Sequence, residues 1–302
     1  MYSEDFREIL RSCTVCPRQC GVDRSRQRGY CRAGMVVRAA KAMLHTGEEP
    51  CLVGSGGAGA IFFTGCNLGC VYCQNYEISQ DGLGWEVDQQ RLAQIMLELQ
   101  QKGASCLDLV TPTPYLAQIA EVLQSIKPRL KIPVVYNCGG YERTETLSWL
   151  SGLVDIYLPD LKYKDSALAA SYSGCADYFE VACAALQEMF RQVGPVQFTA
   201  DGRLKKGLLV RHMVLPGAYH DSLELMRWLA AAFPPGAIRV SLMSQYTPTE
   251  RVAQTASLRR RVTTYEYEKV VEEALALGLQ GYSQKRSSST MALRPEFDGQ
   301  GI

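Results

Sequence analysis

Residues 65–75 read GCNLGCVYCQN and contain the three cysteines that decide the fold. Cys66, Cys70 and Cys73 have the spacing C-x3-C-x2-C, which brings three thiolates around one small inorganic cluster. A 4Fe–4S cluster has four irons that are each normally held by one cysteine thiolate, so three ligands leave one iron open. An open metal position is typical of a catalytic site, whereas a structural site is closed.

At these residues the chain resembles the radical S-adenosylmethionine superfamily. In that superfamily the open iron binds the amino and carboxylate groups of S-adenosylmethionine, whose cleavage yields a 5′-deoxyadenosyl radical that abstracts hydrogen from a substrate. The resemblance implies a 4Fe–4S cluster and S-adenosylmethionine as cofactors, the three cysteines as catalytic ligands, and Tyr72 beside the adenine. A zinc knuckle, an electron-transfer cluster and three buried cysteines are the alternatives. The apolar segment at residues 60–63, directly before the motif, argues against them.

Length, charge and cysteine content bound the class of protein. A chain of 302 residues is ordinary for a single α/β barrel. Its 32 Lys and Arg residues balance 31 Asp and Glu residues, so the basic footprint of a nucleic-acid-binding protein is missing. Neither a signal peptide nor an apolar stretch of roughly 18 residues is visible, which predicts a cytoplasmic protein without a membrane partner. Twelve cysteines in a reducing compartment indicate metal ligation rather than disulfides.

From about residue 58 the chain alternates β-rich runs with amphipathic segments, as βα units around a parallel sheet do. Six strands are expected at residues 60–64, 106–110, 133–137, 154–158, 208–215 and 238–243, with a further last strand at 281–284. Helices are expected at residues 88–102, 114–126, 143–150, 177–192, 221–233 and 265–277. Asp201 and Gly202, within residues 197–210, predict a β-hairpin before the fifth strand.

The expected fold is therefore α/β, a partial (β/α)6 TIM-like barrel of parallel strands with a cysteine-rich N-terminal extension. In such barrels the functional side chains sit at the carboxyl ends of the strands. Residues 1–57 form the predicted extension and residues 58–284 the predicted barrel. Residues 285–302 lose periodicity and gain Ser and Gly, which predicts a flexible C-terminal tail.

The extension carries a second group of cysteines with the spacing C-x2-C-x3-C-x10-C. Its members are Cys13, Cys16, Cys20 and Cys31. Four soft thiolates at this spacing suit zinc or a second, closed iron–sulfur cluster, and sequence does not separate the two. Free cysteine is often simply buried, which is the metal-free alternative.

Residues roughly 60 to 284 resemble the pyruvate formate-lyase activating enzyme and its relatives, which install a glycyl radical on a partner enzyme. An uncharacterised subgroup of those relatives shares the beginning Cys-x-x-Cys-Pro-Arg-x-Cys-Gly. The resemblance implies that Asn137, Lys162 and Arg211 contact the cofactor from successive strand ends. A turn residue and two surface cations are the plain alternatives. His212 alternates away from Arg211, so we expect it to face the helices.

Three departures from those relatives limit what the resemblance implies. Residues 111–113 read Thr-Pro-Thr where most relatives have Gly-Gly-Glu, and Tyr246 stands where a histidine is expected after the sixth strand. We expect Thr111 and Tyr246 to be cofactor-binding positions with altered contacts. Only fourteen residues separate Cys73 from Asp88, too few for the ferredoxin-like insertion of many glycyl-radical activases. The partner therefore need not be a glycyl radical enzyme.

The function predicted from sequence is that of a radical S-adenosylmethionine oxidoreductase acting on a protein, peptide or small molecule, with an activase-like role included. Such an enzyme needs an electron donor such as flavodoxin or ferredoxin. A non-catalytic iron–sulfur electron carrier or sensor and a zinc-stabilised scaffold are the alternatives. Asn137, Lys162 and Arg211 favour the enzyme, because a carrier needs no cosubstrate pocket.

Overall fold

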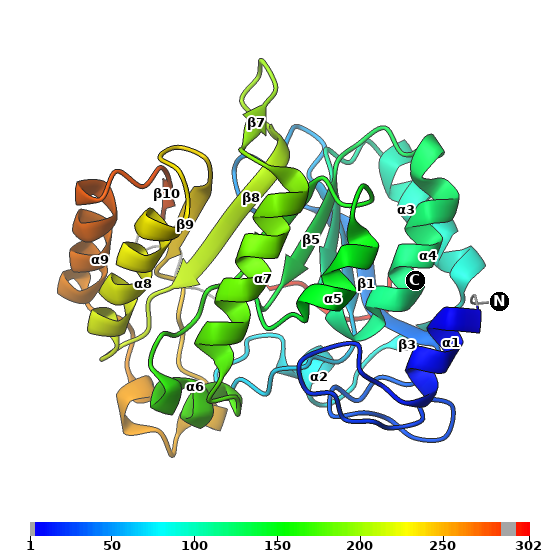
Figure 1. Cartoon of the computed structure of the whole chain (residues 1–302), viewed down its shortest axis with the longest axis horizontal. Coiled ribbons are helices and arrows are strands. Elements are labelled where there is room, and N and C mark those ends of the chain that lie inside the picture. Colours follow the sequence, from blue (N-terminus) through cyan, green and yellow to red (C-terminus); the bar gives the residue numbers. More distant parts are fainter. Residues whose placement is uncertain (1–3, 285–293) are drawn as a thin grey trace.

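The computed structural model describes residues 4–284 and 294–302, and in this part of the chain the strands form one open sheet. The strand order is β10-β9-β8-β6-β5-β4-β2-β1-β3, with β7 paired to β8 alone. Helices cover the outer face of the sheet (Figure 1). The two edge strands of this order, β3 and β10, do not pair with each other, so the barrel is open.

Seven neighbouring strands run parallel, which extends the predicted six-strand barrel by its expected last strand. They are β2 (Ala58–Phe63), β4 (Leu107–Val110), β5 (Val134–Cys138), β6 (Ile156–Pro159), β8 (Leu204–Met213), β9 (Arg239–Met243) and β10 (Gly281–Ser283). The connecting helices are α3 (Gln89–Gln101), α4 (Leu116–Ile126), α5 (Thr144–Leu147), α6 (Ser166–Ser173), α7 (Tyr178–Val193), α8 (Tyr219–Ala232) and α9 (Thr264–Ala276). The α/β partial barrel expected from the sequence is confirmed.

Local sequence signals explain where helix α3 begins and where the predicted hairpin turns. Asp88 caps α3, because its carboxylate accepts a hydrogen bond from the backbone N–H of Arg91 at 2.7 Å. The predicted hairpin is formed by β7 (Gln197–Phe198) and β8, and Gly202 supplies the positive φ of 81° that its turn requires. Helix caps and turn glycines were therefore readable in the sequence.

Successive side chains along each strand point to opposite faces of the sheet, one set into the barrel and the other into the layer beneath the helices. On β5, Tyr136 packs in the large core under the helices, whereas Val135 and Asn137 point into the barrel. At the amino ends of the parallel strands a smaller apolar cluster includes Cys51 and Leu52. These two residues come from the loop after β1, so that loop closes this end of the barrel.

Two strands that the sequence did not predict complete the sheet. β1 (Val37–His45) pairs antiparallel with β2 and with β3 (Trp85–Val87). Most of β1 is buried on both faces, so its sequence lacks the alternation of a half-exposed strand. The short helices α1 (Glu4–Arg11) and α2 (Tyr76–Ser79) and the eight-residue α6 were not predicted either.

The C-terminal residues 294–302 correct the expectation of a flexible tail. The backbone N–H of Ala42 on β1 donates to the carbonyl of Gln300 at 3.0 Å, and Lys41 pairs with Asp298 at 3.0 Å. Phe297 is 7% exposed. This segment forms no regular element, which is why its sequence lacks periodicity, but it is held by backbone hydrogen bonds to β1. The remainder of the predicted tail, residues 285–293, lies outside the described residues.

Candidate functional site

The cysteine loop leaves the carboxyl end of β2 and ends at the short helix α2. Gly65 turns the chain there with a φ of +94°, and an added Cβ would lie 2.4 Å from the carbonyl oxygen of Cys31. Its backbone N–H donates to the carbonyl of Ile78 at 2.9 Å. Cys70 is buried, and Cys66 and Cys73 are half-buried. The loop is therefore fixed at its start by a position that only glycine fits.

Each of the three sulfurs has a polar hydrogen beside it. The backbone N–H of Leu68 donates to Cys66 Sγ at 3.4 Å. Cys70 Sγ lies 2.9 Å from the hydroxyl of Ser173, and Cys73 Sγ lies 3.3 Å from the hydroxyl of Ser79. Hydrogen bonds of this kind stabilise negative charge on sulfur and tune iron–sulfur clusters.

The arrangement fits a cluster better than a single ion. In residues 4–284 and 294–302 no three His, Cys, Asp or Glu side chains close around one point at the distances of a mononuclear site. In a 4Fe–4S cluster each thiolate binds a different iron, so the sulfurs stand further apart. Burial raises the pKa of the Cys66 and Cys73 thiols. A bound metal offsets this cost because it replaces the proton on sulfur.

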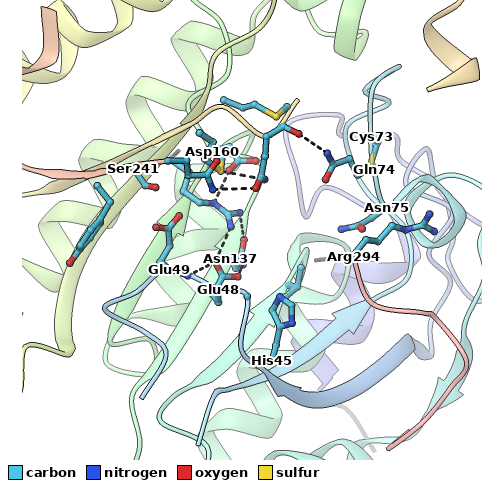
Figure 2. A pocket seen from close by; sticks show the side chains of 18 of the residues that line it. His45, Glu48, Glu49, Cys73, Gln74, Asn75, Asn137, Asp160, Ser241 and Arg294 are labelled. Atoms are coloured by element: carbon cyan, nitrogen blue, oxygen red, sulfur yellow. Dashed lines mark hydrogen bonds and ion pairs between the residues drawn. The ribbon is translucent and has the colours of Figure 1, made fainter. Parts of the chain in front are cut away.

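A cavity of about 410 Å³ lies beside the loop, and Cys70, Tyr72 and Cys73 form part of its wall. This volume is in the range of ordinary small-molecule sites. Figure 2 shows the loop residues on one side and the charged residues of the strand ends on the other. The wall also includes Met213 and Met243, which end β8 and β9. The cavity therefore lies at the carboxyl ends of the strands, where barrel enzymes place their active sites.

Three predicted site residues meet in one hydrogen-bonded network across this cavity. Arg211 donates through Nη2 to Asn137 Oδ1 at 2.6 Å and through Nε to Asp160 Oδ1 at 3.0 Å. Lys162 Nζ lies 2.6 Å from the other oxygen of Asp160. Glu48 Oε1 lies 3.3 Å from Arg211 Nη1. The network joins β5, β6 and β8 with the loop that follows β1.

Asp160 is the bridge of this network, and the sequence reasoning missed it. Burial acts to raise its pKa, but Lys162 and Arg211 outweigh burial and hold the pKa below its ordinary value. Asp160 is therefore a carboxylate shared by two cations. Its position at the end of β6, two residues before Lys162, was the signal that could have found it.

Two further carboxyl groups at the cavity had no such signal. Glu48 and Glu49 belong to the loop after β1, a strand that was not predicted. Burial, followed by repulsion from Glu48, raises the pKa of Glu49 to about 7. Inside the barrel, Asp108 is fully buried, and its Oδ1 has no hydrogen-bond partner among the described residues. The cavity wall thus contains three carboxyl groups, those of Glu48, Glu49 and Asp160, beside the two strand-end cations.

Tyr72 lies in the cavity wall beside Cys70 and Cys73, and its contact with the adenine stays a prediction. Its ring packs edge-on against Tyr172 and Tyr246, and its hydroxyl is hydrogen-bonded to that of Tyr163. Tyr246 is 1% exposed and donates its hydroxyl hydrogen to the carbonyl of Leu258. Tyr246 therefore supports Tyr72 from behind, and its neighbour Gln245 is the residue that reaches the cavity.

Thr111, like Tyr246, is not among the described residues that line the cavity. It has a φ of +58°, and its N–H donates to the carbonyl of Asn137 at 2.8 Å. Val110 is the residue of β4 that lines the cavity. Direct cofactor contacts by Thr111 and Tyr246 stay predictions. His212 faces the helix layer as expected, because its ring nitrogens meet Leu161 O and Ser222 Oγ.

The four N-terminal cysteines lie outside this cavity, on the far side of the cysteine loop. Cys13, Cys16 and Cys31 are buried, and Cys20 is exposed. Figure 1 shows the N-terminal segment, in dark blue, beside α2 at the edge toward which the arrow of β8 points. The extension therefore lies at the same end of the barrel as the three-cysteine loop.

The fold and the site define an α/β partial barrel with an open three-cysteine loop at the carboxyl ends of its strands. Residues 60–162 match the family model of the Radical SAM superfamily. Enzymes of this superfamily use a 4Fe–4S cluster and S-adenosylmethionine, the cofactors that the loop and the cavity fit. No described helix is both long and apolar enough to cross a membrane.

One relative in sequence and two solved structures resemble this chain. An uncharacterized protein of Methanocaldococcus jannaschii is 29% identical over 282 residues, covering 90% of this chain and 76% of that protein. SuiB of Streptococcus suis, bound to its precursor peptide SuiA, has a TM-score of 0.52 and 13% identity over 73% of this chain. This chain covers only 46% of SuiB. A radical SAM methyltransferase from Sphaerobacter thermophilus has a TM-score of 0.50 and 12% identity, covering 78% of this chain and 70% of that chain. These structures share the fold.

Proposed function

We propose that this chain is a radical S-adenosylmethionine enzyme that holds its cluster through Cys66, Cys70 and Cys73. When bound, the cluster and S-adenosylmethionine supply a 5′-deoxyadenosyl radical, which takes a hydrogen atom from the substrate. One observation carries the proposal: Cys70 and Cys73 of the three-cysteine loop and the network of Asn137 and Arg211 line the same cavity. An electron carrier has no use for a cavity with convergent charged groups beside its cluster.

The strand-end residues have separate roles in this proposal. Lys162 and Arg211 are cations that offer charge-assisted hydrogen bonds to the carboxylate of the cosubstrate. Asp160 holds both cations in place before the cosubstrate binds, because it accepts from each of them. Preorganised groups of this kind cost little reorganisation when the ligand arrives. Tyr72 offers an aromatic surface at the wall beside the cysteines.

We propose a protein, a peptide or a small molecule as the substrate, and flavodoxin or ferredoxin as the electron donor. SuiB binds a precursor peptide, which supports a peptide as one candidate. An activase-like role belongs to the same proposal but needs no ferredoxin-like insertion. The connection from Cys73 to α3 holds only the four-residue α2 and the three-residue β3.

Anaerobic reduction in the presence of S-adenosylmethionine tests the proposal. The wild-type chain is purified anaerobically, its cluster is reduced with dithionite, and 5′-deoxyadenosine and methionine are measured by chromatography. We expect both products in equal amounts. A reducible cluster that leaves the cosubstrate intact would identify the electron carrier instead, and bound zinc without iron would identify the scaffold.

A further inference from the structure

Arg24 is a buried cation whose partners are sulfurs. Its side chain is 3% exposed, and its Nε donates to Cys13 Sγ at 3.1 Å. Nη2 lies 3.7 Å from Cys31 Sγ, and Nη1 donates to the carbonyl of Pro114. In residues 4–284 and 294–302 Arg24 forms no ion pair with a carboxylate. A buried charge without a counter-charge is strongly unfavourable, and thiolates that bind a metal at Cys13 and Cys31 would supply the counter-charge.

Cys20 lies close to Cys31, one of the two cysteines that contact Arg24. An added Cβ on Gly29 would lie 3.2 Å from Cys20 Sγ and 3.8 Å from Cys31 Sγ, so both sulfurs flank Gly29. Cys13 is held beside the segment that follows Cys20, because the N–H of Cys13 donates to the carbonyl of Val22 at 3.0 Å. Two segments that are separate in sequence are thus folded onto each other, with Cys13 and Cys31 buried and Cys20 exposed.

A recurring backbone turn points N–H groups at these sulfurs. The N–H of the residue two positions later faces the sulfur at Cys16, Cys20 and Cys31. The same relation is seen in the three-cysteine loop, where the N–H of Leu68 donates to Cys66 Sγ. Such donors stabilise thiolates that bind metal. Burial nonetheless raises the pKa of the Cys16 and Cys31 thiols, a cost that a bound metal offsets because it replaces the proton on sulfur.

We propose that Cys13, Cys16, Cys20 and Cys31 hold a second metal centre as four thiolates, and that Arg24 is its buried counter-charge. A thiophilic metal is required, either a closed 4Fe–4S cluster or a zinc ion. A cluster at this site would be held by all four cysteines. Its four protein ligands leave no open iron, so this centre does not bind S-adenosylmethionine.

The centre is fastened to the barrel beside the three-cysteine loop. Arg18, which lies between Cys16 and Cys20, donates to the carbonyls of Asn67 at 2.9 Å and Gly174 at 2.7 Å. The close approach of Gly65 to the Cys31 carbonyl fixes the same contact from the other side. Loss of the second centre should therefore loosen the first loop as well as the extension.

Metal analysis of a variant that lacks the first site tests this proposal without changing any N-terminal cysteine. In the Cys66→Ala/Cys70→Ala/Cys73→Ala variant we expect about four irons and four sulfides per chain, against about eight of each in the wild type. One zinc per chain in that variant also supports the four-thiolate centre and assigns it to zinc. A folded triple variant without iron or zinc overturns the proposal, whatever the wild type does with S-adenosylmethionine.

A second set of variants tests the ligands and the counter-charge. Adding Cys13→Ser and Cys31→Ser to the triple variant should remove the remaining metal, whereas Cys183→Ser, a half-buried cysteine on α7, should leave it. Arg24→Met should weaken retention against a chelator by roughly 10- to 100-fold, and Arg24→Lys should restore part of it. Equal retention in Arg24→Met and the wild type would remove Arg24 from the proposal, and retained metal after the cysteine changes would overturn the ligand set.

Discussion

Glu49→Gln should stabilise the folded protein, and the gain should grow with pH. Glutamine has the shape of protonated glutamate and can keep the hydrogen bond that Ser241 gives to this side chain. Burial raises the pKa of Glu49 from 4.5 to about 7, so the folded protein disfavours the charged form. Glutamine removes that penalty because it cannot ionise.

The sign and size follow from linkage between protonation and folding. Below pH 4.5 Glu49 is protonated in the folded and the unfolded chain, so the wild type and the variant should be equally stable. Between pH 4.5 and 7 the unfolded chain loses the proton while the folded chain keeps it, so wild-type stability falls as pH rises. The advantage of the variant should be about 1 kcal/mol at pH 5.5 and about 3 kcal/mol at pH 8.

Anaerobic urea unfolding of the wild type and Glu49→Gln at pH 5.5, 7 and 8 measures this difference. Glu86→Gln on β3 is the matched control, because Glu86 is exposed, and it should have little effect at any pH. An advantage of Glu49→Gln that is absent at pH 8, or equal at all three values, would refute the conclusion that burial keeps the Glu49 carboxyl protonated near neutral pH.

Three further changes test other parts of the site. Asp160→Asn should destabilise the protein by about 1.5–3 kcal/mol in urea unfolding, because it removes the carboxylate that two partly buried cations share. Glu145→Gln in an exposed pair should cost about 1 kcal/mol or less, and equal costs would contradict the role of Asp160 as a shared carboxylate. Arg211→Ala and Lys162→Ala should weaken S-adenosylmethionine binding in calorimetry and leave the absorbance of the cluster unchanged. The loss should be larger for Arg211→Ala, because a guanidinium holds a bound carboxylate in a fixed geometry. Unchanged binding in both variants would show that the two cations have a structural role only. Gly65→Ala should lower iron content, because its Cβ would meet the Cys31 carbonyl at 2.4 Å; full iron occupancy would show that the loop can move.

The sequence predicted the barrel well because most of its strands and helices carry their own local signals. The strands lie within a few residues of their predicted positions, and Asp88 caps its helix as its sequence indicates. β1 was missed because it is buried on both faces and antiparallel, so it has neither the alternation nor the following helix of a βα unit. Missing β1 also hid Glu48 and Glu49.

Site residues with a motif were found, and those without one were not. Asn137, Lys162 and Arg211 meet at the cavity, and their contacts with the cofactor stay predictions. Asp160 and Arg24 act through tertiary pairing, which local sequence does not encode. Tyr246 follows the sixth strand as expected, yet packing against Tyr72 turns it away from the cavity.

Formation of 5′-deoxyadenosine by single cysteine variants tests the central claim most directly. Cys66→Ala, Cys70→Ala and Cys73→Ala each remove one of three protein ligands of the proposed cluster, whereas Cys183→Ala changes a cysteine on α7 away from the loop. Each protein is reduced anaerobically with S-adenosylmethionine, and the product is measured by chromatography. The account predicts product from the wild type and Cys183→Ala and none from the three loop variants. Cosubstrate cleavage that persists in any of the three would contradict it.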